Sequence, residues 1–233
     1  MRNRILIFII IINVSFVSSQ TFRTGLPFIH NFKPETYNAD NQNWGIVQDS
    51  RGLMYFANNN GVLNYNGNTW QIVGTADNMS TIHSLAIGIK GIIYAGGYAE
   101  FGFLEATATG QIRYHSLIEK VPKQYRKFDY VWNIYPTKRG VVFQSTYESF
   151  YYVDDSIEII HHPSESVRSF LVMDRLFMLF KDRMREIIDG KFIDIPLGGE
   201  MSELSVVFMV PFMENEILFG PNQKVFSFII SNK

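Results

Sequence analysis

Five segments of the chain repeat one short pattern, and this repeat restricts the fold more than any other feature. Each segment has a glycine or polar turn residue followed by apolar residues and one aromatic residue. The segments read GLMYFA (52–57), GIIYAG (91–96), GVVFQS (140–145), DRLFML (174–179) and EILFGP (216–221). The aligned aromatic residues are Tyr55, Tyr94, Phe143, Phe177 and Phe219, and their spacings of 39, 49, 34 and 42 residues average 41. A period of about 40 residues is typical of one four-stranded β-propeller blade.

The first repeat shows the strand pattern within a unit. Short apolar or aromatic runs are separated by an Asp-Ser-Arg-Gly turn (49–52), an Asn-Asn-Asn-Gly turn (58–61) and an Asn-Gly-Asn hairpin signal (66–68). The four predicted strands cover 44–48, 53–57, 62–65 and 69–73. Helical periodicity is absent from this unit, so the pattern predicts an antiparallel blade.

The repeat therefore predicts an all-β fold, a β-propeller with about five four-stranded blades. We expect the blades at about 44–73, 82–117, 131–160, 167–196 and 204–233. The last unit offers only about three strands, which predicts an incomplete ring. One interpretation is that the chain is the front part of a longer protein, which the family resemblance described below favours. The alternative is a complete five-blade ring in which residues 21–43 supply the missing outer strand, since an unpaired edge is an aggregation hazard.

Composition excludes several classes of function. Twenty-one basic and 22 acidic residues give a net charge of −1, which leaves no electrostatic footprint for nucleic acid. The absence of cysteine excludes disulfides, thiolate metal sites and a cysteine nucleophile. Aromatic residues make up 15% of the chain and charged residues only 18%, which favours strands over disorder or a coiled coil.

The N-terminus has the layout of a secretory signal peptide over residues 1–19. Arg2 and Arg4 precede a 13-residue stretch, 5–17, that is apolar except for Asn13 and Ser15, and small residues follow at 18 and 19. An uncleaved anchor is the alternative, but the run is shorter than the roughly 20 residues of a spanning helix. We therefore expect an exported chain with cleavage after Ser19 and a lead-in segment at 20–43.

Residues 25–104 resemble a known family. The opening GLPFIHNF (25–32), the EFGFL string (100–104) and a motif spread over the first blade are similar to the sensory propeller of Bacteroidetes-type two-component regulators that carry a triple-tyrosine domain. The motif residues are Trp44, Ile46, Asp49, Gly52, Tyr55, Gly61, Leu63, Tyr65, Gly67 and Trp70.

This resemblance implies a periplasmic ligand sensor within a membrane-bound transcriptional regulator, non-catalytic by itself. In that family the propeller is followed by an immunoglobulin-like triple-tyrosine domain, a membrane span and an output domain. The chain itself would then contact neither nucleic acid nor membrane, and a homodimer of the full-length form stays open. The expected ligand is a small molecule or a glycan, and no cofactor or metal is implied.

The repeat also predicts where a ligand would bind. Loops between the second and third strands fall at equivalent positions in each blade and differ in content, as suits recognition on a repeated scaffold. The candidate residues are Asn59, Asn60, Tyr98, Glu100, Tyr147, Glu148, Lys181, Arg183 and Asn222. Taken one at a time, each residue is better explained as part of a solvated turn.

No sequence motif points to catalysis, so we predict no enzyme and no catalytic residue. Nucleophile-elbow, zincin, P-loop and dinucleotide fingerprints are absent. Core packing explains Trp44, Trp70 and Trp132 better than carbohydrate stacking does, and a solvated loop explains His161 and His162 better than a metal site. Two alternatives remain, namely a secreted propeller enzyme acting on polysaccharide and a free-standing interaction propeller.

Overall fold

The structure is a computed structural model that describes residues 29–75, 81–107, 109–195, 206–220 and 226–229. All the described strands belong to one compact unit, which begins at Lys33. The predicted signal peptide lies outside the described residues. No helix within those ranges is long and apolar enough to cross a membrane.

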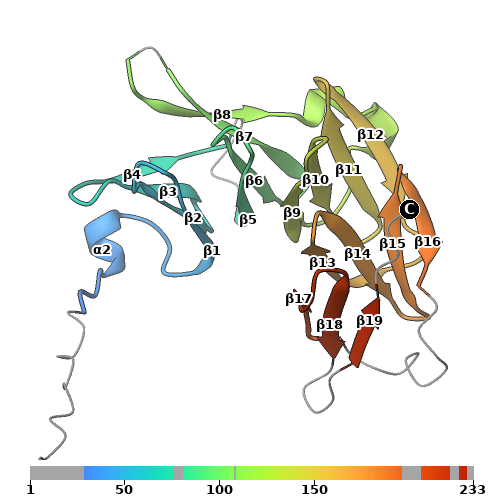
Figure 1. Cartoon of the computed structure of the whole chain (residues 1–233). Coiled ribbons are helices and arrows are strands. Elements are labelled where there is room, and N and C mark those ends of the chain that lie inside the picture. The colour runs from blue at the N-terminus through green and yellow to red at the C-terminus, as the bar shows by residue number, and fades with distance from the viewer. Residues whose placement is uncertain (1–28, 76–80, 108, 196–205, 221–225, 230–233) are drawn as a thin grey trace, which may run out of the picture. The chain divides into compact units, whose positions relative to one another are not determined.

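Within the described residues, nineteen strands form five consecutive sheets, which we call blades 1 to 5 (Figure 1). Blades 1 and 2 consist of β1 (Asn43–Gln48), β2 (Met54–Asn58), β3 (Gly61–Tyr65) and β4 (Trp70–Val73), then β5 (Ile82–Ile87), β6 (Ile93–Gly97), β7 (Glu100–Ala106) and β8 (Ile112–Ser116). Blade 3 consists of β9 (Asn133–Pro136), β10 (Val141–Gln144), β11 (Glu148–Val153) and β12 (Ser156–His161). Blades 4 and 5 consist of β13 (Ser166–Val172), β14 (Arg175–Phe180), β15 (Met184–Ile188) and β16 (Lys191–Asp194), then β17 (Phe208–Pro211), β18 (Glu216–Gly220) and β19 (Phe226–Ile229).

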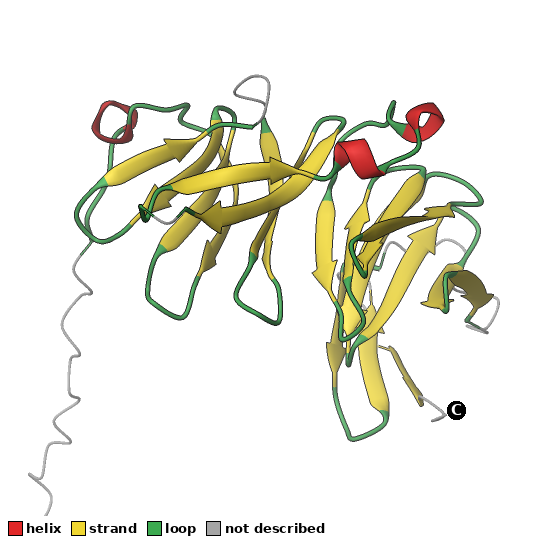
Figure 2. Ribbon diagram, turned by 90° about the horizontal axis from the view of Figure 1, so that it is seen from above, coloured by secondary structure: helices red, strands yellow, loops and turns green. Residues whose placement is uncertain are grey.

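Each blade is an antiparallel meander in which strands pair in chain order (Figure 2). Four blades have four strands, and the fifth has three within the described residues. The few helical turns are α2 (Pro34–Tyr37), η1 (Ile118–Lys120) and η2 (Lys123–Tyr125). The all-β prediction is thus confirmed.

Tight turns close the outer strand pairs at positions that the sequence marks with Asp, Asn and Gly. In blades 3 and 4, two-residue loops at Asp154–Asp155 and Asp189–Gly190 have φ between 47° and 72°, as hairpins of type I′ require. Another two-residue loop, Met173–Asp174, joins β13 to β14 and uses the same left-handed region. In blade 1, Gly52 takes a φ of 88° and donates its N–H to Asp49 O at 3.0 Å.

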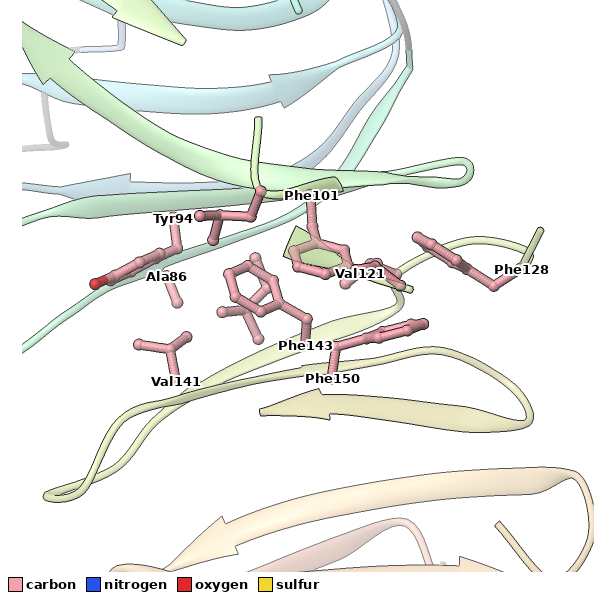
Figure 3. Packing of buried hydrophobic residues seen from close by; sticks show 11 residues of the cluster. Ala86, Tyr94, Phe101, Val121, Phe128, Val141, Phe143 and Phe150 are labelled. Carbon is pink, nitrogen blue, oxygen red and sulfur yellow. The ribbon is translucent and has the colours of Figure 1, made fainter. Parts of the chain in front are cut away.

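The hydrophobic core lies between successive blades. The repeated aromatic residues are all buried there, with exposed fractions of 2% for Tyr55, 8% for Tyr94, 0% for Phe143 and Phe177, and 1% for Phe219. Figure 3 shows the cluster between blades 2 and 3, where Phe143 stacks on Phe101 with 4.5 Å between ring centroids. The residue that repeats in sequence is therefore the one that packs each blade against a neighbour.

Candidate ligand-binding site: an aromatic platform

The first strands of blades 1, 2 and 4 contain a one-residue irregularity near their N-terminal ends. The register shifts between Asn43 and Gly45 in β1, between Ile82 and Ser84 in β5, and between Ser166 and Arg168 in β13. A β-bulge of this kind re-aims the side chain of the extra residue. In blades 1 and 2 the re-aimed residues are Trp44 and His83.

Blade 3 also places a tryptophan at the start of its first strand, but without a bulge. Trp132 immediately precedes β9 and donates its N–H to Gln144 O at 2.9 Å, while the next residue, Asn133, pairs with Gln144 in the ladder. Three consecutive blades therefore present a ring side chain at the start of the first strand, from a bulge in blades 1 and 2 and from the residue before a regular strand in blade 3.

These rings meet. The centroid of His83 lies 4.4 Å from Trp44, 4.2 Å from Tyr130 and 5.6 Å from Trp132. Tyr130 also lies 5.2 Å from Trp132 and 5.2 Å from Tyr98. We call Trp44, His83, Tyr98, Tyr130 and Trp132 the aromatic platform. Its members come from three blades, although 88 residues separate Trp44 from Trp132 in the chain.

The platform is open to solvent. Trp44 is 46% exposed, Trp132 is 44% exposed and Tyr98 is 59% exposed. Both indole groups are nonetheless fixed, because Trp44 Nε1 donates to Asn59 Oδ1 at 2.9 Å and Trp132 Nε1 donates to Thr146 Oγ1 at 3.1 Å. Asn59 and Thr146 each lie in the turn between the second and third strands of their own blade. Exposed rings held in one orientation are suited to stacking against a ring of a ligand.

A backbone bridge brings the two tyrosines together. Val131 N–H donates to Gly97 O at 2.9 Å, Ala99 N–H donates to Asp129 O at 3.1 Å, and Tyr98 pairs with Tyr130. Glycine permits this approach, since a Cβ at Gly96 would lie 2.6 Å from Val131 Cγ1. The two glycines that end β6 thus position the tyrosine part of the platform.

Two of the sequence-predicted site residues belong to this region. Tyr98 is a member of the platform, and Asn59 holds the indole of Trp44. Asn60 lies in the same turn as Asn59, where its N–H bonds to Asn58 Oδ1 at 3.0 Å. That any of these three contacts a ligand stays a prediction.

The remaining candidates have other surroundings. Glu100 Oε1 accepts hydrogen bonds from Tyr114 at 3.0 Å and Ser116 at 2.7 Å, so this carboxylate is hydrogen-bonded within blade 2. Tyr147 is 55% exposed at the turn of blade 3, and burial raises the pKa of its neighbour Glu148. Lys181 pairs with Glu165, and Arg183 pairs with Asp182 and Asp194, so both cations are neutralised within blade 4. Asn222 lies outside the described residues.

The structure corrects the interpretation of two tryptophans as core residues. Trp44 and Trp132 are half exposed: the bulge in β1 turns Trp44 away from the blade interface, and Trp132 lies just before the regular strand β9. Trp70 fits the expectation better, since it is half-buried against Tyr65 and Phe56. A bulge has no marker in this sequence, and only the shared place of Trp44, His83 and Trp132 at the start of successive blades could have suggested it.

The structure also corrects the solvated-loop interpretation for His162. Its Nδ1 lies 3.0 Å from Thr146 O and its Nε2 lies 2.9 Å from Ser149 Oγ, whereas His161 is exposed at the end of β12. Hydrogen bonding of Ser149 to an oriented histidine resembles a nucleophile–base pair, but Ser149 is 0% exposed. A substrate has no access to that hydroxyl, so the pair is structural. The region of the chain that the structure describes holds no cluster of three metal-ligating side chains.

The burial of His162 predicts a pH-dependent stability. Burial lowers the pKa of His162 below its ordinary value of about 6.5, so the unfolded chain binds a proton more readily than the native one. Stability is then full above about pH 6.5 and falls as the pH drops toward the native pKa. We expect the melting temperature to fall from pH 7.5 to pH 5 and expect His162→Gln to reduce this slope. An equally steep slope in both proteins would contradict the assignment to His162.

The repeated antiparallel sheets with inter-blade cores define a β-propeller, and solved structures agree. The chain aligns with virginiamycin B lyase from Staphylococcus aureus at a TM-score of 0.51 and 16% identity, covering 83% of this chain and 73% of the lyase. It aligns with the extracellular domain of a putative one-component system from B. thetaiotaomicron at a TM-score of 0.54 and 17% identity. This alignment covers 80% of this chain but only 26% of that domain. It aligns with the WD40 propeller domain of Doa1 at a TM-score of 0.54 and 13% identity, covering 82% of this chain and 70% of that domain.

At these identities the likeness concerns the fold alone. No protein-family model matches the sequence, and no curated protein matches it significantly. The structural neighbours include both a lyase and the extracellular domain of a putative one-component system.

Proposed function

We propose that this chain is the ligand-sensing propeller of a membrane-bound transcriptional regulator, exported to the periplasm and without catalysis of its own. The aromatic platform is its binding site, and the ligand is a ring-bearing small molecule, of which a glycan is the first class to test. The membrane and the nucleic acid would be reached only through other parts of such a regulator.

The proposal rests mainly on the aromatic platform. Two tryptophans and a tyrosine are 44–59% exposed and come from three blades. Both tryptophans contact His83, and Tyr98 contacts Tyr130, which itself contacts His83. Burying those aromatic surfaces against a ligand ring gains hydrophobic free energy, while the bonds to Asn59 and Thr146 reduce the entropy lost on binding. The sequence resemblance at residues 25–104 and the structural neighbour from a putative one-component system support a sensing role.

Export rests on the sequence of the N-terminus. A basic start, an apolar stretch at 5–17 and small residues at 18–19 are typical of a secretory signal. An exported location also suits a propeller whose platform samples ligands outside the cytoplasm.

A glycan array probed with the purified chain tests the proposed binding. We expect the wild-type chain to bind a limited set of glycans, and we expect Trp44→Ala with Trp132→Ala to weaken that binding at least about tenfold, the equivalent of 1.4 kcal/mol. Trp70→Phe is the matched control, because Trp70 packs within blade 1 outside the platform. Binding that survives loss of both platform tryptophans would place the site elsewhere.

The same experiment separates sensing from enzymatic function. Mass spectrometry of each bound glycan after prolonged incubation is expected to find it unchanged. Cleavage of a glycan would instead establish the alternative of a secreted propeller enzyme. Absence of any bound glycan would remove this ligand class and favour an interaction propeller.

A further inference from the structure

His83 occupies the centre of the aromatic platform. Its ring links Trp44 of blade 1 to Tyr130 and Trp132, which lie at the entrance to blade 3. The Trp44 and Tyr130 rings tilt by 35° and 58° relative to the imidazole, whereas Trp132 meets it edge-on at 72°. The position of each tryptophan relative to the other therefore depends on the ring between them.

The surroundings of His83 favour the neutral imidazole. Its Nδ1 is buried, and among the described residues it has no hydrogen-bond partner. Burial lowers the pKa of His83, since a charged ring there would lose its hydration. Protonation would also place an N–H at Nδ1 where no acceptor is present, which is costly in a buried site.

The charged groups around His83 offer no compensation. Neither β1 nor β5 carries a charged residue, and β6 carries none. Tyr130 contributes an aromatic ring to these surroundings, and Tyr98 packs on Tyr130. The acids that lie next to Tyr130 and close to Tyr98 in the sequence already accept hydrogen bonds. Asp129 accepts from the N–H and the hydroxyl of Thr146, and Glu100 accepts from Tyr114 and Ser116. The faces of the surrounding rings attract a cation, but they supply no acceptor for its N–H.

We propose that neutral His83 is the positioning residue of the platform, holding Trp44 and Trp132 in the arrangement that binds a ring ligand, and that protonation of His83 releases this arrangement. This inference rests on the proposed function for its ligand, while its structural part concerns the unliganded chain. Only the fraction of molecules with neutral His83 would bind, so apparent affinity would fall about tenfold per pH unit below the pKa of His83.

The first test needs no ligand. Indole ¹⁵N–¹H resonances of the purified chain are followed from about pH 8 to about pH 4.5, with circular dichroism to confirm that the chain stays folded. We expect the Trp44 and Trp132 resonances to move together along one titration curve while Trp70 stays constant. His83→Phe, which keeps an aromatic ring but does not titrate, is expected to abolish the movement.

A second histidine variant makes this test specific. His162 bonds to Thr146, which in turn holds Trp132, so its protonation could move Trp132 alone. His162→Gln is therefore measured beside His83→Phe, with His115→Phe as the control for an exposed histidine on β8. If Trp44 does not titrate, or if the titration survives His83→Phe, the positioning role is wrong.

The second test links His83 to binding. Glycans retained on the array at pH 7.5 are reapplied at pH 5.5, and wild type is expected to lose affinity while His83→Phe binds equally at both values. His83→Ala, which removes the ring, is expected to bind weakly at both. Equal pH dependence in wild type and His83→Phe would overturn the proposal. An array without any bound glycan would count against the proposed function alone, because the resonance test still decides the role of His83.

Discussion

Replacing Phe143 with alanine is expected to lower the free energy of unfolding by about 3–5 kcal/mol, the range for truncating a buried phenylalanine. Phe143 is 0% exposed and stacks on Phe101 across the interface between blades 2 and 3, with Tyr94 edge-on at 5.9 Å. Removing its ring would leave a cavity between two sheets whose rigid ladders limit collapse. Chemical denaturation of the purified chain measures the effect.

Phe212→Ala provides the matched control for Phe143→Ala. Phe212 is 52% exposed in the connection between β17 and β18, so its truncation removes little buried surface. We expect a change within about 0.5 kcal/mol, as for ordinary surface substitutions. Similar losses for both variants would mean that the repeated aromatic residue does not pack the blades together as described.

Arg175→Met is expected to destabilise the chain by about 3 kcal/mol, because it leaves a buried carboxylate without its partner. Arg175 Nε and Nη2 donate to the two oxygens of Glu186 at 2.6 and 2.5 Å. The Glu186 side chain is only 5% exposed, and it lies in β15 opposite Phe177. The cost arises from the unpaired charge, so adding Glu186→Leu to Arg175→Met is expected to restore most of the stability.

Arg139→Met is the control for the ion pair in blade 4. Arg139 bonds to Glu158 at 3.2 Å, but the two side chains are 53% and 47% exposed, and a solvated pair of this kind contributes at most about 1 kcal/mol. Denaturation curves of wild type, Arg175→Met, the double variant with Glu186→Leu, and Arg139→Met distinguish the buried ion pair from the solvated one. No recovery on adding Glu186→Leu would show that the arginine acts through packing rather than through charge.

The sequence predicted the fold well because the fold is repeated. Each inter-blade core uses the same strand position, so Tyr55, Tyr94, Phe143, Phe177 and Phe219 reveal the period directly. The turns were equally readable, since Asp49 and Gly52 have side chains or backbone angles that few other residues supply. The constant spacing was sufficient to predict the blades, and the local chemistry of the turn residues was sufficient to predict the turns.

The platform was harder to predict, for a physical reason. The direction of a strand residue follows from simple alternation unless a bulge intervenes, and one extra residue reverses the face that a side chain occupies. Trp44 lies in such a bulge and Trp132 lies just before a regular strand, so both matched a core pattern while the structure exposes them. Tyr130 lies in an irregular connection and His83 stood alone in the sequence, so only the packing of three blades brings them together.

An indole NMR titration tests binding at the platform most directly. The chain has three tryptophans, and thus three indole resonances, which are followed during titration with a soluble form of the glycan that the array retains most strongly. We expect the Trp44 and Trp132 signals to shift with one saturating curve while the Trp70 signal stays in place. A shift of Trp70 alone, or saturation without any change at Trp44 and Trp132, would contradict a ligand site on the aromatic platform.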